Sequence, residues 1–359
     1  MTTSTTTRTD ARSSGSSSSS SLMFGIVTLL LVVLGSSFAI KGAAASTVTN
    51  TEDEEPSSEK NTCENPHYHP KDESLLLYHF ESTTSTQDEA KKIVQNDDCF
   101  FSNSNNPNTV KAFCVTAAEQ TNGRGTSGRL WLGARGNTFV TIGIPQEAWM
   151  KGLRNVPLTL LPLRIGSIVA SRVQALLEEC GSGRLAESSE NTNPPMVTVK
   201  WPNDVLVDEK KISGVLIESS MNGWFLIGIG VNLAYAPPVP ASGPNNGRAS
   251  TCIQDFCPPS ELSLKLEEGV AQQLGVDLAH DLHEWMQEAM NNDDDHSSME
   301  AESVLKEWKE WVDWDMELIM RDTPNHERVR MVDILPDGRV QVVGQEDGLQ
   351  RTLVSDYFL

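Results

Sequence analysis

The chain has 359 residues, with 28 lysines and arginines against 49 aspartates and glutamates, and a formal net charge of −21. Hydrophobic residues make up 38% of it, which supports a packed core and excludes a wholly disordered or collagen-like chain. The negative charge argues against binding to a nucleic-acid backbone, because phosphate neutralisation requires a surplus of Lys and Arg. The length predicts about two domains.

The N-terminal region is predicted to be a targeting segment over residues 1–46. Arg8 and Arg12 precede an apolar stretch at 22–40, and small residues follow at 42–46, an order typical of secretory or organelle-import signals. Residues 36–40 resemble the cleavage region of plastid-directed presequences. An uncleaved signal anchor is the alternative to a cleaved signal, and the cytoplasm is the alternative location. Residues 47–73 are predicted to be an acidic, disordered linker.

Apolar patterning predicts the elements that follow in chain order. Strands are expected over 75–80, 110–118, 137–144, 197–199 and 224–231, with a hairpin of 205–207 and 212–218. Helices are expected over 86–94, over 158–180 and across the stretch where Leu262 to Leu278 recur every four residues. Residues 181–195 and 291–298 are predicted as loops, and 329–359 as a small β module that must dock to be stable.

The six cysteines are scattered, and none lies in a C-x-x-C pair. This favours neither a zinc ribbon nor a dense disulfide scaffold, so no protein metal site is predicted. Spacing allows a local pair between Cys252 and Cys257 but does not favour it.

A glycine-rich loop at residues 121–131 is the first candidate for chemistry. Gly123, Gly125 and Gly128 permit close backbone approach, and Arg124 and Arg129 supply two guanidinium groups for a phosphate or carboxylate. The loop is neither a P-loop nor a dinucleotide-binding turn. A polar hairpin turn without a ligand is the competing interpretation.

Two further segments carry candidate residues. Lys200 stands between a predicted strand and a Pro-Asn-Asp turn, where a fixed ammonium can neutralise developing charge on an oxygen. A surface lysine beside a turn is the alternative. Glycines interrupt the apolar strands at Gly214, Gly228 and Gly230, which indicates that a ligand or another strand approaches the backbone closely.

Together these segments resemble the biotin–protein ligases, a group within the biotin/lipoate ligase superfamily. The similar segments are the SerThrGln start of the first helix at 85–90, the glycine-arginine loop at 121–131, the Lys-Trp-Pro-Asn-Asp block with Lys211 to Glu218, and the Gly-Ile-Gly-Val-Asn run at 228–232. The resemblance implies an α+β fold, a mixed central β-sheet flanked by helices as in class II synthetases. It places this catalytic domain at 74–320 and an SH3-like β-barrel at 321–359.

The resemblance also implies a reaction and its residues. Biotin and ATP form biotinyl-5′-AMP, and the biotin then passes to a carrier-domain lysine of a carboxylase such as acetyl-CoA carboxylase. Lys200 and Arg124 are the implied catalytic residues. The implied biotin-binding residues are Ser85, Thr86, Gln87, Gln120, Gly123, Arg124, Gly125, Thr126, Lys200 and Gly214. Those for ATP or the adenylate are Arg124, Arg129, Trp131, Asn203, Lys211 and Asn232, of which Asn232 could instead satisfy backbone at a strand end. Mg²⁺ would be held through the ATP phosphates.

Two positions depart from the family pattern. Thr126 replaces an arginine of the loop, and Gln87 replaces an asparagine. Weaker retention of the activated intermediate is therefore expected. A lipoate–protein ligase and a non-catalytic biotin-binding module remain the alternative functions. No nucleic acid or membrane is expected as a partner of the mature enzyme, and a homodimer is considered.

Overall fold

The computed structural model describes residues 67–95, 111–154, 156–181, 194–240, 247–257, 269–291, 297–320 and 326–354, together with Lys265 and Thr323. The chain divides into a unit of residues 1–60 and a unit of residues 61–359. The first unit lies outside the described residues, and so do the expected targeting segment and most of the expected linker.

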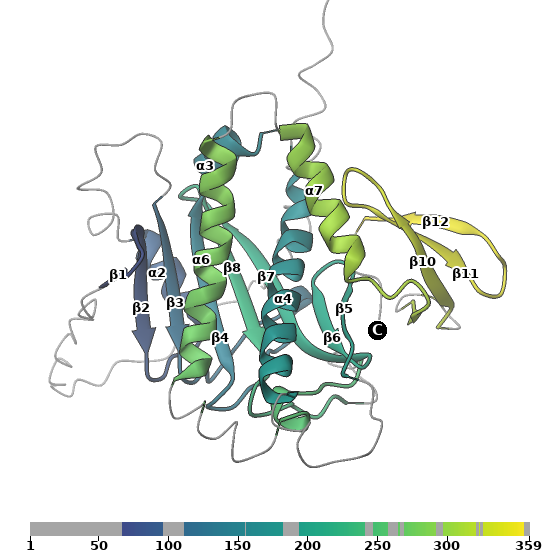
Figure 1. Ribbon diagram of the computed structural model, residues 1–359, viewed down its shortest axis with the longest axis horizontal. Coiled ribbons are helices and arrows are strands. Elements are labelled where there is room, and N and C mark those ends of the chain that lie inside the picture. Colours follow the sequence, from purple (N-terminus) through teal and green to yellow (C-terminus); the bar gives the residue numbers. More distant parts are fainter. Residues whose placement is uncertain are drawn as a thin grey trace, which may run out of the picture. The chain divides into compact units, whose positions relative to one another are not determined.

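An eight-stranded mixed sheet forms its centre, in the order β1-β2-β3-β4-β8-β7-β6-β5 (Figure 1). The strands are β1 His67–His69, β2 Asp72–Phe80, β3 Ala112–Ala117, β4 Thr138–Pro145, β5 Val197–Lys200, β6 Asp204–Val207, β7 Lys210–Ser220 and β8 Trp224–Val231. Only β2 and β3 pair in parallel among these described strands. The expected mixed sheet is therefore confirmed, with β8 in its interior as predicted.

Helices cover both faces of the sheet, because its strands are apolar on both sides. Along β2, Leu75 and Leu77 join one hydrophobic core, whereas Leu76 and Tyr78 join another, as the two-residue repeat of a strand requires. The larger core contains side chains of α3 Gln146–Gly152, α4 Leu161–Gly181, α6 Val270–Asn291 and α7 Ser297–Glu310. The smaller core contains side chains of α2 Thr86–Gln95.

Helix α4 is the central helix of the larger core and lies between α6 and α7 in Figure 1. Among the described residues, the stretch Leu158–Cys180 is the one helix long and apolar enough to cross a membrane. Leu161, Ile165, Val169 and Val173 are nevertheless buried against the sheet and its neighbouring helices. The helix is therefore the core helix that its periodicity predicted.

A second, four-stranded antiparallel sheet lies at the C-terminal end, in the order β12-β11-β10-β9. Its strands are β9 Glu317–Ile319, β10 Arg328–Ile334, β11 Val340–Gly344 and β12 Gln350–Leu353. It is consistent with the expected SH3-like module. Its buried side chains belong to the larger core, so it docks as expected.

Several elements differ from the sequence expectations. β1 and the start of β2 fall within the stretch 47–73 predicted as linker, and β9 begins before residue 321. The helices α3 and α7 were not predicted. Helix α6 begins at Val270 and continues to Asn291, whereas Leu262 and Leu266 lie outside the described residues.

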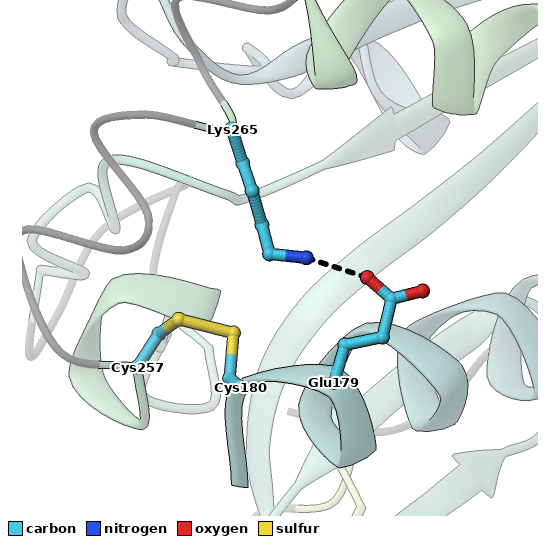
Figure 2. Close-up of a disulfide and its surroundings, with 4 residues drawn as sticks. All are labelled: Glu179, Cys180, Cys257 and Lys265. Atoms are coloured by element: carbon cyan, nitrogen blue, oxygen red, sulfur yellow. Dashed lines mark hydrogen bonds and ion pairs between the residues drawn. A yellow bond between two sulfur atoms is a disulfide. The ribbon is translucent and has the colours of Figure 1, made fainter. Parts of the chain in front are cut away.

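A disulfide joins Cys180, at the end of α4, to Cys257, in the segment that follows β8 (Figure 2). The two Cα atoms are 5.0 Å apart, and an ion pair of 2.6 Å between Lys265 and Glu179 lies beside the bridge. Cys252 is buried and free, so the local Cys252–Cys257 pair considered above is wrong. The bridged cysteines are 77 residues apart and meet only through the tertiary fold, which spacing does not reveal.

Removal of this bridge is expected to destabilise the folded unit. Loop-closure entropy for a separation of 77 residues predicts a loss of about 4 kcal/mol in the free energy of unfolding. Urea denaturation of the Cys180→Ala/Cys257→Ala variant against the oxidised chain measures it. A reductant should weaken the parent chain but leave the double variant unchanged. Equal stability of the oxidised and reduced parent would contradict a structural role for the bridge.

Candidate active site

Paired glycines of β7 and β8 make a flat floor at the middle of the sheet. Gly214 lies opposite Gly230, and Gly228 lies opposite Leu216. A Cβ atom on Gly230 would stand 2.3 Å from the indole of Trp131, and one on Gly228 would stand 3.2 Å from the amide carbon of Gln87. Both side chains therefore lie directly on the backbone, which is the close approach that the glycines predicted.

The glycine-arginine loop folds over this floor as a flap, defined here as residues 121–131. The Gly125 N–H donates to the Arg129 carbonyl at 2.8 Å, and the Trp131 N–H donates to the Gly123 carbonyl at 2.9 Å. A single 3₁₀ turn, Thr126–Gly128, forms the tip, where Gly128 has a φ of 73°. These bonds make the flap a short hairpin that brings Trp131 back onto the sheet.

A cavity lies between the flap, the start of α2 and the glycine floor. Eleven of the predicted binding residues line it: Ser85, Thr86, Gln87, Gln120, Arg124, Gly125, Thr126, Trp131, Asn203, Lys211 and Gly214. The sequence analysis did not assign the other lining residues to the site: Val140, Val215, Leu216, Gly228, Ile229 and Gly230. Gly228 and Gly230 were predicted as positions where a ligand or another strand approaches the backbone, without being assigned to a ligand. The apolar residues carry no chemical signal that separates them from core residues.

One wall of the cavity is a network of hydroxyl and amide groups. Gln120 Oε1 accepts hydrogen bonds from the Thr86 N–H at 2.8 Å and from Thr86 Oγ1 at 3.1 Å. Thr141 Oγ1 donates to Thr86 Oγ1 at 2.9 Å, and the Gln87 N–H donates to Ser85 Oγ at 3.3 Å. The capped start of α2 thereby fixes the orientation of these groups.

Gln87 brings an unused acceptor to this wall. Its Nε2 donates to Glu218 Oε2 at 3.0 Å and to the Leu226 carbonyl at 3.4 Å, so the amide orientation is set by two acceptors. Gln87 Oε1 is buried and has no hydrogen-bond partner among the described residues. Because an unpaired buried acceptor costs free energy, this oxygen is suited to an N–H or O–H group of a ligand.

Two lysines surround one carboxylate next to the site, and one of them, Lys211, lines the cavity. Asp204 Oδ1 lies 2.5 Å from Lys211 Nζ, and Asp204 Oδ2 lies 3.3 Å from Lys200 Nζ. Burial acts to raise the pKa of Asp204, but the two ammonium groups outweigh it and hold that pKa well below its usual range. Lys211 also lies 5.6 Å from the centre of the Trp131 ring, within cation–π distance. Asp204 was not predicted as a site residue, although it belongs to the quoted motif.

Four predicted residues do not line the cavity. Lys200 is buried, only 3% exposed, with its ammonium held by Asp204, and it does not line the cavity. Arg129 donates to Thr126 Oγ1 at 2.6 Å within the flap, and Gly123 packs against the Trp131 carbonyl. Asn232 donates to the Thr251 carbonyl at 3.1 Å, which corresponds to the structural alternative considered for it.

Arg124 occupies the rim between the flap and the sheet. Its Nη1 lies 2.7 Å from Asp88 Oδ1 of α2, and its Nη2 lies 3.2 Å from Glu218 Oε2 of β7. Its side chain is 32% exposed. The sequence analysis named Arg124 but assigned no role to either carboxylate.

Known proteins resemble the part of the chain that contains this cavity. Residues 80–233 match the family described as Biotin/lipoate A/B protein ligase. Over this segment the chain is therefore similar to that ligase family, as its motifs led us to expect.

Two of the matched relatives are named as biotin ligases. The chain is 35% identical over 136 residues to the Biotin--[acetyl-CoA-carboxylase] ligase of Paracoccus denitrificans, covering 36% of this chain and 48% of that protein. It is 30% identical over 165 residues to the Biotin--protein ligase 2 of Arabidopsis thaliana, covering 44% and 42%. The chain thus spans about half the length of the curated relatives it matches. A crystal structure of the biotin protein ligase from Leishmania major in complex with biotinyl-5-AMP is 28% identical, with a TM-score of 0.43, covering 78% of this chain and 98% of that one.

Proposed function

We propose that this chain is an ATP-dependent biotin–protein ligase that forms biotinyl-5′-AMP and transfers the biotin to a lysine of a carrier domain. The observation that carries the proposal is the cavity itself, which places a hydroxyl and amide wall next to Arg124 and Lys211 over a floor without side chains. Such a site suits a ligand that is a neutral hydrogen-bonding ring at one end and an anion at the other.

The free acceptor Gln87 Oε1 favours biotin over lipoate. The ureido ring of biotin carries N–H donors and a carbonyl acceptor, so it can complete the hydrogen bonds of Gln87 and its neighbours. The dithiolane ring of lipoate has no N–H donor and would leave Gln87 Oε1 unpaired, which disfavours it.

The first step joins two anions, so it needs positive charge between them. A carboxylate oxygen of biotin attacks the α-phosphorus of ATP, and the bond from that phosphorus to the bridging oxygen breaks to release pyrophosphate. Lys211 lines the cavity and is fixed by Asp204, so it needs little reorganisation to stabilise the added charge on the phosphoryl oxygens. Lys200 is held by the same carboxylate, and we propose that it contacts the anion once that is bound. Arg124 would donate a charge-assisted hydrogen bond from its guanidinium to the carboxylate or phosphate.

Mg²⁺ would accompany the triphosphate. Among the described residues no group of three or more His, Cys, Asp or Glu side chains is arranged to hold a metal ion. Asp204 is paired with two lysines, so we assign the ion to phosphate oxygens and water molecules. Its contribution when bound is charge neutralisation of the leaving pyrophosphate.

The second step consumes the adenylate. The neutral ε-amine of a carrier lysine attacks the acyl carbon, AMP leaves with the bonding electrons, and the nitrogen loses a proton as the amide forms. We propose a carboxylase carrier domain as the acceptor, since the relative from Paracoccus denitrificans bears the name of an acetyl-CoA-carboxylase ligase. We propose neither nucleic acid nor membrane as a partner of the mature enzyme, and a homodimer stays a proposal.

Pyrophosphate release separates the candidate functions. The chain, ATP and Mg²⁺ should release pyrophosphate with biotin and not with lipoate. Lipoate-dependent release would favour a lipoate ligase. Biotin binding without any release would favour the non-catalytic module and contradict the proposal.

Residues 1–46 are proposed to direct the chain to an organelle or the endomembrane system. The segment lies outside the described residues, and the Cys180–Cys257 bridge supports an oxidising compartment at some stage of maturation. A fluorescent fusion of residues 1–70 tests the proposal, and diffuse cytosolic fluorescence would refute it.

Thr126→Arg is expected to lengthen the lifetime of enzyme-bound biotinyl-AMP. A guanidinium on the flap tip adds a charge-assisted hydrogen bond to the ligand, worth roughly tenfold in retention. The bond from Arg129 Nε to the Thr126 carbonyl survives the change, since it uses the backbone. Release of labelled adenylate, with Thr126→Val as the matched control, measures the effect. An unchanged lifetime would show that position 126 does not contact the intermediate.

A further inference from the structure

We propose that Asp88 and Glu218 form a two-carboxylate clamp that positions Arg124 and holds the flap closed before any ligand binds. The inference deepens the proposed function, because it assigns positioning residues to the same site. It rests on the geometry around one guanidinium, which is held from two different elements of the fold.

The two carboxylates grip the terminal nitrogens of Arg124 from two elements. Asp88, in the first turn of α2, contacts Nη1 at 2.7 Å, and Glu218, on β7, contacts Nη2 at 3.2 Å. Two separate anchors fix the plane of the guanidinium, whereas a single contact would leave it free to rotate. Arg124 Nε is buried and has no hydrogen-bond partner among the described residues. The clamp therefore leaves Nε as a buried, oriented donor for an oxygen of the ligand.

Glu218 also connects the flap to the ligand-binding wall. The Oε2 atom that contacts Arg124 accepts the hydrogen bond from Gln87 Nε2 at 3.0 Å, and Lys91 Nζ lies 3.1 Å from the same oxygen. One carboxylate thus sets the orientation of the free acceptor Gln87 Oε1 and of the free donor Arg124 Nε. A ligand that engages Gln87 would be coupled through Glu218 to the flap.

The clamp is electrostatic and only partly buried, so its strength should depend on salt. The side chains of Arg124 and Asp88 are each 32% exposed, and that of Glu218 is 19% exposed. Exposed pairs are individually weak and are screened by ions. We expect the clamp to set the closing equilibrium of the flap, with little effect on the stability of the domain.

The experiment compares Asp88→Asn, Glu218→Gln and the double variant. Glu218→Gln keeps an acceptor for Gln87 and removes the charge. The matched control is Glu81→Gln, which removes an exposed ion pair of 3.0 Å to Arg135 beside the flap. Hydrogen exchange of the backbone amides of residues 121–131 is measured in the ligand-free chain. The double variant should exchange roughly tenfold faster there, with the control unchanged. Added salt should speed exchange in the parent chain and not in the double variant.

Unchanged flap exchange in a folded double variant, or equal salt dependence of the two chains, would overturn the clamp. This readout needs no ligand, so it decides the clamp even if the chain makes no biotinyl-AMP. A second readout is the release of free biotinyl-AMP. It should rise above the level of the parent chain in both single variants and stay at that level in Glu81→Gln. Failure of adenylate formation in the parent chain would instead count against the proposed function.

Discussion

Lys200→Ala is expected to lower the rate of biotinyl-AMP formation by on the order of 10²-fold or more, as for loss of one preorganised electrostatic stabiliser. The Lys200 ammonium is buried and fixed by Asp204, so it carries its charge in a medium of low polarity. After the substitution Asp204 still pairs with Lys211, and the fold should survive. Biotin-dependent pyrophosphate release measures the rate.

Two further variants separate the effect of the Lys200 charge from a general effect of substitution. Lys200→Met retains the shape of the side chain without its charge and should behave like the alanine variant. Lys210→Ala removes an exposed lysine at the start of β7 and should leave the rate unchanged. Because Lys200 does not line the cavity in the ligand-free structure, its role requires contact with the bound anion. Near-normal adenylate formation by Lys200→Ala would refute that role.

Arg124→Ala is expected to release free biotinyl-AMP into solution roughly tenfold faster than the parent chain. The substitution removes a charge-assisted contact to the intermediate and both ion pairs that hold the flap. An acyl-adenylate hydrolyses when water reaches it, so its transfer to a carrier should become inefficient. Chromatography of the reaction mixture, with the chain removed, measures the released intermediate.

The result separates two roles of Arg124. A slower first step with normal retention would indicate that the arginine acts on the phosphate and not on the flap. Unchanged release together with unchanged turnover would contradict both. The control is Arg135→Ala, since Arg135 follows the flap but forms only an exposed pair with Glu81.

The pattern of apolar residues predicted those strands and helices in which apolar residues form continuous runs or recur at a regular spacing. β2, β8 and α4 follow from runs of apolar residues because their faces are buried in one or two cores. α7 was missed, since its stretch is rich in charged residues and, among its residues 300–310, only Val304 and Trp308 are deeply buried. The bridge between Cys180 and Cys257 was missed because its partners meet only through tertiary packing.

The motifs predicted those parts of the site whose residue types carry a recognisable chemistry. They identified the flap, the glycine floor and the hydroxyl and amide wall, which the structure brings together around one cavity. They did not reveal that Asp204 joins two lysines or that Asp88 and Glu218 share Arg124. Such pairs depend on how β6, β7, α2 and the flap meet, so they cannot be derived from residue type and spacing alone.

The intact mass of a carboxylase carrier domain tests the central claim most directly. The carrier is incubated with the chain, biotin, ATP and Mg²⁺, and a carrier with its acceptor lysine replaced serves as the control. The account predicts a mass increase of one biotinyl group on the parent carrier, dependent on ATP and absent from the control. An unchanged mass, although the chain binds biotin and ATP, would contradict it.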